Sequence, residues 1–197
     1  MKSLDDGIGE VLGSLRQTGI ERSTLVIFTS DNGGERFSYH WPFMGQKSSL
    51  WEGGIRVPAI VRWPGVVPAG RVSEQAAITM DWTATILGAG QTKPDPGFPL
   101  DGFDLMPAIR PVTGNPLPST DRTFFWRNSN QDAVRRGRWK YLNDGTLEYL
   151  FDLSIDQREQ ANFRDQNPAM FNQLRSEFQK WQSQVLPRPP ARPPRVI

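Results

Sequence analysis

The chain has 197 residues, with 23 Lys and Arg against 21 Asp and Glu and a formal net charge of +2. This near balance excludes the broad basic face that binding to a phosphate backbone needs. The lack of cysteine excludes disulfides, thiolate zinc sites and a thiol nucleophile from this chain. The one histidine, His40, excludes any site that needs two imidazoles, so chemistry must rest on carboxylates, amides and lysine.

The first predicted elements are an amphipathic helix and a buried strand. Apolar residues from Leu4 to Leu15 recur at helical spacing, with Ser3 as the N-cap and Gly19 just past the end. Residues 24–30 form a continuous apolar, β-branched run, which is typical of a strand covered on both faces. A helix followed by such a strand indicates an α/β fold.

The middle of the chain alternates loops with short elements. Residues 31–50 show no periodicity and indicate a long loop of the kind that often carries function. Residues 55–63 predict a second strand, which Pro58 moves toward a sheet edge, and residues 79–87 predict a helix. Residues 88–120 are rich in proline and glycine, so we place the seam between two subdomains there.

Beyond this seam the pattern changes to short alternating strands and one last helix. Residues 138–142 alternate basic with aromatic side chains, so Arg138 and Lys140 are expected on the wet face of an antiparallel sheet. Asn167 and Pro168 open a final helix by the capping rules. The expected strands cover residues 123–127, 132–136, 138–142 and 148–151.

Candidate site residues lie in the long loop. Asp31 and Asn32 come directly after the predicted buried strand, where α/β sheets bind ligands, and their oxygens suit Ca²⁺ or Mg²⁺. The same residues also suit a tight turn, and two ligands alone cannot hold calcium. Lys47 is either an anion-binding group or an ordinary surface lysine, and Gln46 excludes a phosphate-binding loop. His40 is either a substrate contact or a structural loop residue.

Residues 24–34 read Thr-Leu-Val-Ile-Phe-Thr-Ser-Asp-Asn-Gly-Gly, and residues 45–58 read Gly-Gln-Lys-Ser-Ser-Leu-Trp-Glu-Gly-Gly-Ile-Arg-Val-Pro. Together these two segments resemble the second half of type I sulfatases. The resemblance implies an alkaline-phosphatase-like α/β fold. It continues through residues 62–65, 81–85, 100–105, 134–141 and 150–153.

The resemblance also implies an activity and a set of roles. Sulfate ester hydrolysis is implied, with Asp31 and Asn32 as two ligands of an active-site Ca²⁺ and Lys47 as the catalytic residue that binds the sulfate oxygens. Glu52 and Arg56 are expected to pair with each other or to pin the loop. The family's formylglycine nucleophile comes from a Cys/Ser-x-Pro-x-Arg sequence, and this chain contains none. The chain thus resembles the carboxyl-terminal half of a sulfatase, and by itself it is expected to be inactive.

The alternative function is a noncatalytic binding or structural module that keeps this fold. In either case the expected organisation is part of the sulfatase α/β domain over residues 1–117, then a small subdomain over 118–186 with an antiparallel sheet and a carboxyl-terminal helix. Residues 187–197 are expected to form an extended Pro/Arg-rich tail.

The expected partner is an aryl or carbohydrate sulfate, provided that the amino-terminal half of a sulfatase is supplied. Self-association, or binding of a separately supplied amino-terminal half, is also expected, with Leu25 to Phe28 at or near the contact. The reason is that the apolar strand is patterned for cover on both faces. The basic and aromatic residues of 135–141 are compatible with nucleic-acid binding, but the near-neutral body favours a solvated hairpin face. We expect no nucleic acid and no membrane partner. No signal peptide or membrane span is recognised in this chain, and the compartment stays open.

Overall fold

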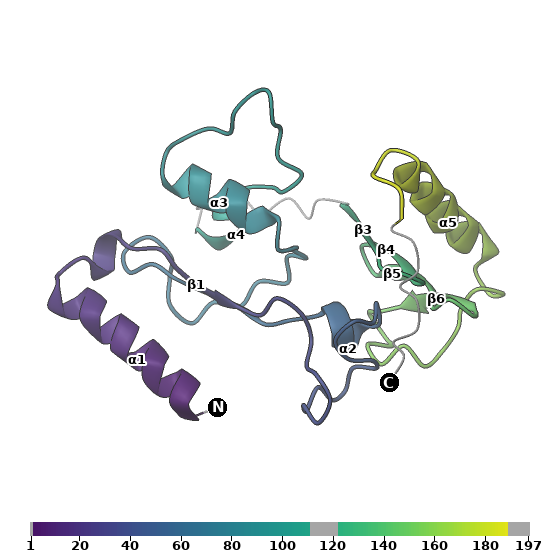
Figure 1. Ribbon diagram of the computed structural model, residues 1–197, viewed down its shortest axis with the longest axis horizontal. Coiled ribbons are helices and arrows are strands. Elements are labelled where there is room, and N and C mark those ends of the chain that lie inside the picture. Colours follow the sequence, from purple (N-terminus) through teal and green to yellow (C-terminus); the bar gives the residue numbers. More distant parts are fainter. Residues whose placement is uncertain (1, 111–121, 189–197) are drawn as a thin grey trace, which may run out of the picture. The chain divides into compact units, whose positions relative to one another are not determined.

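The computed structural model describes residues 2–110 and 122–188, and these form two compact units (Figure 1). The first unit holds the described residues of 1–29 and 58–119, and the second holds those of 30–57 and 120–197. Helices and strands occur in both, so the expected α/β class is confirmed. The domain boundaries expected at residues 117 and 186 stay predictions, because residue 117 lies outside the described residues.

The first unit begins with the predicted amphipathic helix, α1 (Lys2–Gln17), followed by the short 3-10 helix η1 (Glu21–Ser23). No residue of α1 is buried within the described structure. A methyl group placed on Gly7 would meet nothing within 4 Å, and Val11 is 59% exposed. The apolar stripe that the sequence predicts is therefore present but uncovered by the described residues.

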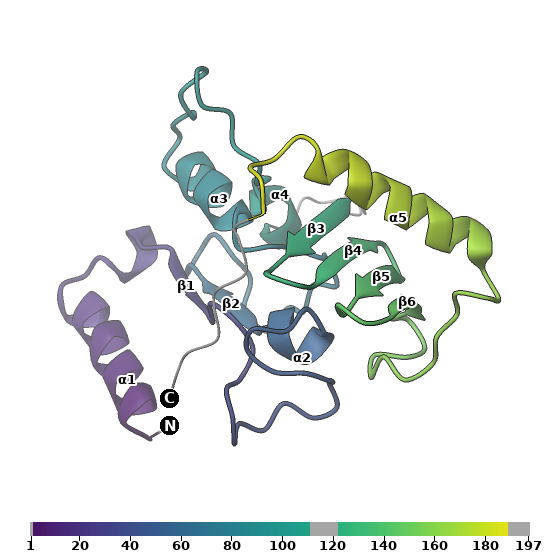
Figure 2. The ribbon, with the colours of Figure 1, turned by 45° about the vertical axis from the view of Figure 1, so that its right-hand side comes forward.

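The predicted buried strand is β1 (Val26–Thr29), and it pairs antiparallel with β2 (Ala59–Arg62) (Figure 2). The strand is confirmed, but its burial is not, since no residue of β1 is buried. Phe28 lies opposite Ile60, and these side chains are 37% and 58% exposed. The β-branched run specifies extended backbone, whereas burial requires layers on both faces, and among the described residues only β2 lies beside β1.

Two short helices complete the first unit, α3 (Asp81–Ala89) and α4 (Met106–Ile109). The Asp81 side chain is fully buried, and its carboxylate accepts hydrogen bonds from the backbone N–H groups of Ile78 and Phe103 at 2.8 and 2.9 Å. A buried carboxylate is tolerated only when such donors replace water. This residue therefore ties the segment before α4 to the start of α3.

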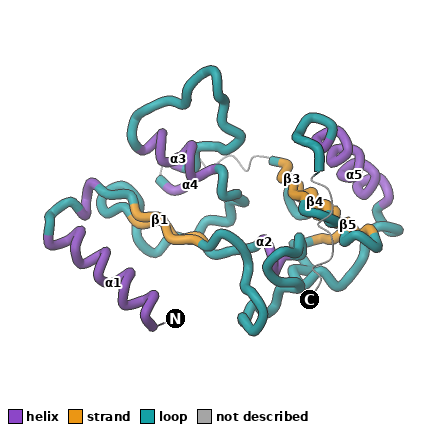
Figure 3. The backbone as a smooth tube through the Cα atoms, viewed as in Figure 1, coloured by secondary structure: helices purple, strands orange, loops and turns teal. Residues whose placement is uncertain are grey.

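The second unit is built on a four-stranded antiparallel sheet in the order β3-β4-β5-β6. Each strand pairs with its neighbour in the sequence, as the alternating pattern predicts. The loop that covers one face of this sheet comes from much earlier in the chain, and most of the chain between β1 and β2 is loop (Figure 3). The strands are β3 (Thr123–Arg127), β4 (Asp132–Arg136), β5 (Trp139–Asn143) and β6 (Glu148–Asp152).

One face of this sheet carries the final helix, α5 (Pro168–Gln182) (Figure 2). The predicted N-cap is confirmed, since the Asn167 side chain accepts a hydrogen bond from the N–H of Met170 at 3.3 Å. Packing of large apolar side chains, worth about 1.5–3 kcal/mol each, holds the helix in place. The buried cluster consists of Val134, Tyr141, Leu150, Phe171, Leu174 and Phe178.

The other face is covered by residues around α2 (Glu52–Ile55), and this corrects a prediction. The sequence places Lys140 on a wet face, but its side chain is fully buried in the structure, whereas the Arg138 side chain is 55% exposed. The alternation of side chains along β5 is as predicted, but the cover comes from distant loop residues. This second cluster contains Leu50, Ala133, Leu142, Phe151 and Leu153, with Trp51 packed against it.

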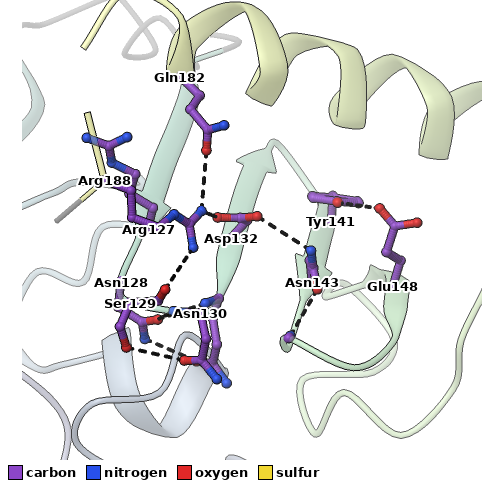
Figure 4. Close-up of polar contacts among 12 residues, drawn as sticks. Arg127, Asn128, Ser129, Asn130, Asp132, Tyr141, Asn143, Glu148, Gln182 and Arg188 are labelled. Atoms are coloured by element: carbon purple, nitrogen blue, oxygen red, sulfur yellow. Dashed lines mark hydrogen bonds and ion pairs between the residues drawn. The ribbon is translucent and has the colours of Figure 1, made fainter. Parts of the chain in front are cut away.

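The described end of the chain returns to the sheet after α5 (Figure 4). Arg188 forms an ion pair with Asp132 of β4 and donates to Gln182 at 3.3 Å. Arg127 of β3 donates to the carbonyl of Leu186. The expected extended tail falls mostly on residues 189–197, which lie outside the described residues.

None of the helices in the described ranges is both long enough and apolar enough to cross a membrane.

Self-association stays a prediction, and the exposed pair on β1 and β2 gives it a test. Replacing Ile60 with Glu is expected to convert a self-associating chain into a monomer, because a charge would stand beside Phe28 on the apolar face. Val72→Glu is the matched control, since Val72 is 86% exposed outside any strand. Light scattering coupled to size exclusion measures the mass. A dilution-stable wild-type monomer that binds no hydrophobic dye would contradict the prediction.

Candidate functional site

The predicted site residues all lie in the part of the second unit formed by residues 30–57. Two backbone hydrogen bonds bring the turn after β1 against the lysine-bearing loop. The N–H of Lys47 donates to the carbonyl of Gly34 at 2.8 Å, and the N–H of Gly33 donates to the carbonyl of Gly54 at 2.9 Å. We call this pair of contacts the clasp. It fixes the backbone of Lys47 beside Gly34, which lies two residues past Asn32.

Glycines make the clasp possible because backbone packs directly on backbone. A Cβ atom on Gly33 would lie 1.8 Å from the carbonyl oxygen of Gly53. A Cβ on Gly54 would lie 2.2 Å from the carbonyl oxygen of Ser49. Real Cβ atoms do not approach oxygen this closely, so no side chain fits at either position. The Gly-Gly pairs in both halves of the recognised pattern are therefore explained by a close approach of the chain to itself.

The Lys47 side chain remains available at the surface. Its Nζ atom lies 3.6 Å from Oε2 of Glu35, and the two side chains are 47% and 65% exposed. An exposed pair at this distance contributes about 0–1 kcal/mol. An incoming anion can therefore compete with Glu35 at small cost.

Asp31 and Asn32 offer oxygen atoms at the carboxyl end of β1. Asp31 is exposed and Asn32 is half-buried, and among the described residues neither side chain takes part in a hydrogen bond or ion pair. Oxygen donors of this kind suit a hard cation such as Ca²⁺, which takes six to eight ligands, so two side chains alone do not complete a site. The described residues contain no group of three or more acids or histidines that would complete it.

His40 lies beside the turn. A Cβ on Gly34 would lie 3.4 Å from Cδ2 of the His40 ring, which is half-buried. The loop around it also exposes aromatic side chains, with Phe37, Tyr39 and Trp41 93%, 87% and 63% exposed. The structure thus brings His40 near the clasp, and a contact with substrate stays a prediction.

A buried ion cluster anchors the far end of the lysine-bearing loop. Nζ of Lys140 lies 2.9 Å from Oε1 of Glu52 and 2.8 Å from Oε1 of Glu159. Oε2 of Glu159 accepts a hydrogen bond from the N–H of Glu52 at 2.6 Å. Arg56 lies 3.6 Å from Glu52, as the sequence led us to expect. Side chains that are at most 2% exposed thus join α2 to β5.

The cluster shifts the pKa values of its two carboxylates in opposite directions. Burial acts to raise the pKa of Glu52, but attraction and hydrogen bonding from Lys140 outweigh it, so the pKa lies below its usual range. Burial also raises the pKa of Glu159, and here Lys140 does not fully offset it, so the pKa stays above its usual range. Glu52 is therefore the firmly ionised partner of Lys140.

Sequence reasoning missed the contacts that the turn between β3 and β4 makes with this loop. Nδ2 of Asn128 donates to the carbonyl of Ser48 at 2.9 Å, and the N–H of Leu50 donates to Oε1 of Gln131 at 2.8 Å. Residues 128–131 of the sequence (Asn-Ser-Asn-Gln) give only the signal of a turn. The partner of a turn side chain 80 residues away leaves no local pattern.

Comparison with known proteins identifies the class. The family model described as Sulfatase matches residues 1–92. N-acetylgalactosamine-6-sulfatase of Mus musculus is 37% identical over 147 residues, which cover 71% of this chain and 27% of that relative. The chain therefore spans about a quarter of the length of this curated relative.

Solved structures agree with the sequence comparison. The crystal structure of Ps i-CgsB in complex with k-i-k-neocarrahexaose matches with a TM-score of 0.81 and 28% identity, covering 90% of this chain and 40% of that chain. The PsFucS1 sulfatase from Pseudoalteromonas sp. matches with a TM-score of 0.75 and 25% identity, covering 92% and 41%. The fold is that of the alkaline-phosphatase-like sulfatases. The chain belongs to the sulfatase family and corresponds to part of the length of its relatives.

Replacing Gly54 with Ala is expected to destabilise the second unit by about 2–3 kcal/mol, because the new methyl group meets the backbone at Ser49. Gly7→Ala is the matched control. It should stabilise α1 by up to about 1 kcal/mol, because that position is open and helical. Urea unfolding followed by circular dichroism measures both. Equal effects of the two substitutions would contradict the close backbone approach at Gly54.

Proposed function

We propose that this chain supplies the calcium-binding and sulfate-binding side of a site that hydrolyses sulfate esters. The observation that carries the proposal is the clasp, which holds the backbone of Lys47 next to the turn that bears Asp31 and Asn32. A cationic side chain beside two oxygen donors matches the needs of a sulfate ester bound against a cation. The family membership of the chain supports the same assignment.

The proposed role of Lys47 follows from its exposure and its weak contact with Glu35. Its ammonium group binds the sulfate oxygens and stabilises the negative charge that develops as the ester bond breaks. Interactions of this kind accelerate the reaction only when they are stronger in the transition state than in the bound substrate. An ammonium group within reach of the ester oxygens meets this condition, because its attraction grows as negative charge builds up on them.

The proposed metal ligands are the side-chain oxygens of Asp31 and Asn32. Calcium bound there supplies Lewis-acid polarisation of the ester oxygens and neutralises charge on the sulfate. The remaining ligands come from water or from groups beyond these two side chains. Glu35 lies one residue past the turn, and its carboxylate keeps Lys47 near the site in the absence of substrate.

The proposed substrate class is a carbohydrate sulfate. The relatives include an N-acetylgalactosamine-6-sulfatase and a protein solved with k-i-k-neocarrahexaose, and these names describe those proteins. In this chain the loop between the turn and Lys47 exposes Phe37, Tyr39 and Trp41, whose flat rings offer apolar surface for a sugar ring. A noncatalytic module would use the same sulfate contact without turnover.

Calcium binding by the 197-residue chain is expected to be weak, about millimolar or weaker, because only two protein ligands are assigned. Asp31→Ala should abolish it, since the mutation removes the charged ligand. Asp5→Ala in α1 is the control, because it changes the net charge equally at an exposed position remote in the sequence. Calorimetric titration measures the affinity. A micromolar constant that survives Asp31→Ala would place the metal elsewhere.

We expect no turnover of a chromogenic aryl sulfate or a sulfated sugar by the 197-residue chain in excess Ca²⁺. The chain contains no Cys/Ser-x-Pro-x-Arg sequence, so nothing assigned in it attacks the sulfur atom. Binding of the sulfated sugar, measured by calorimetry, should still weaken in Lys47→Ala and should be unchanged in Lys180→Ala, an exposed lysine of α5. Turnover that Lys47→Ala abolishes would overturn the expectation, and equal binding by both variants would overturn the role of Lys47.

A further inference from the structure

Several contacts fix the backbone of the lysine-bearing loop, and those at Ser48, Leu50 and Glu52 come from the carboxyl-terminal part of the second unit. The clasp holds the N–H of Lys47. Asn128 and Gln131, in the turn between β3 and β4, hold the carbonyl of Ser48 and the N–H of Leu50. Glu159 accepts a hydrogen bond from the N–H of Glu52, and Lys140 donates one to the Glu52 side chain.

The contact from Asn128, one residue past the lysine, supports an unusual backbone conformation. Ser48 directly follows Lys47 and has a φ of +73°, in the left-handed region that residues other than glycine rarely adopt. Such a conformation persists only when its surroundings hold it, and it is found most often at functional sites. The hydrogen bond from Nδ2 of Asn128 to the Ser48 carbonyl is such a constraint.

The direction of the Asn128 amide is itself determined by its turn. Its Oδ1 atom accepts hydrogen bonds from the N–H of Asn130 at 3.1 Å and from the N–H of Gln131 at 2.8 Å (Figure 4). With the oxygen committed to these donors, the nitrogen donates to the Ser48 carbonyl at 2.9 Å and to Oε1 of Gln131 at 3.3 Å. The amide therefore connects a closed turn of the sheet to the strained residue beside Lys47.

We propose that Asn128 is a positioning residue for Lys47: its amide holds Ser48 in the left-handed conformation and so fixes the point from which the lysine side chain extends. The functional part of this inference rests on the proposed role of Lys47 in sulfate binding. The structural part, coupling between Asn128 and the backbone of the loop, stands without it. Asn128 contacts no reacting group. It acts through Ser48 and, by its hydrogen bond to Oε1 of Gln131, through the N–H of Leu50.

Two substitutions separate positioning from the stability of the turn. Asn128→Ala removes both functions of the side chain. Asn128→Asp keeps an oxygen for the N–H groups of Asn130 and Gln131. It removes the amide donor, which otherwise reaches the Ser48 carbonyl at 2.9 Å and Oε1 of Gln131 at 3.3 Å. Asn130→Ala is the matched control, because it removes an exposed amide from the same turn. Among the described residues, that side chain accepts a hydrogen bond only from the Ser129 hydroxyl, at 3.5 Å.

The first measurement is amide hydrogen exchange in the 197-residue chain. Both Asn128 variants should speed exchange at Lys47 and Leu50 roughly five- to tenfold, the effect expected from losing one hydrogen bond, and should leave Val134 in β4 unchanged. Asn130→Ala should change none of these rates. Wild-type rates at Lys47 and Leu50 in both Asn128 variants, or equal acceleration at Val134, would overturn the proposal.

The second measurement follows the lysine side chains by NMR during titration with inorganic sulfate, with the Lys47 signal assigned through Lys47→Arg. The wild-type Lys47 signal should shift with sulfate, and both Asn128 variants should need more sulfate for the same shift. Agreement between Ala and Asp is required, because Asp also adds a negative charge. A wild-type Lys47 signal that ignores sulfate would contradict the proposed function and leave the exchange result to decide the positioning role. Faster exchange with unchanged sulfate response would show that Asn128 does not position the ammonium, and would also overturn the proposal.

Discussion

The ion cluster between Lys140, Glu52 and Glu159 is the interaction on which the second unit depends. Charges this deeply buried are tolerated only in contact with opposite charges, and breaking such a pair costs about 3–5 kcal/mol because a charge remains buried without compensation. The lysine lies in β5 of the sheet, whereas Glu52 comes from a segment before the sheet in the sequence and Glu159 from one after it. The loop that ends in α2 therefore cannot leave the sheet without exposing or stranding these charges.

This constraint explains why residues 30–57 form a compact unit with the carboxyl-terminal sheet although they follow β1 directly. Apolar packing adds to the charge pairing, since Trp51 lies against Tyr149 and Phe151 with ring centroids 5.4 and 5.5 Å apart. The clasp then joins this anchored loop to the turn that follows β1. The sheet therefore restrains the turn through the loop, and glycines allow the backbone segments to approach closely enough for this.

Local patterns in the sequence predict most of the fold. Helical spacing predicts α1 and α5, alternation predicts β3 to β6, and capping chemistry places the start of α5 at Asn167. The sequence does not predict which residues pack over each face of a sheet. Alternation divides the residues of a strand between two faces but does not say what covers them, so it leaves Lys140 on a solvent-exposed face. The residue that buries and pairs with it, Glu52, is 88 residues away. The burial expected for β1 fails for the same reason.

The site shows the same division between local and distant information. Family resemblance directs attention to Asp31, Asn32 and Lys47, and the clasp joins the backbone of Lys47 to Gly34, in the turn that follows Asn32. Their roles at a site stay predictions. Asn128 escapes sequence reasoning because an asparagine in a turn has the same pattern whether its amide meets water or a carbonyl 80 residues away. The strained residue Ser48 gives no signal either, since serine is common in loops of every conformation.

Two lysines in one unit show how burial divides a single chemistry into two roles. Lys140 is fully buried between two carboxylates, which neutralise its charge, so no anion from solvent can reach it. Lys47 meets one exposed carboxylate at 3.6 Å, a pair worth at most about 1 kcal/mol, so its charge remains available to a ligand. The first lysine fixes the loop on which the second stands. An anion-binding ammonium must be free to change partners, whereas its backbone must not move, and these opposite requirements are met by placing one lysine in the core and the other at the surface.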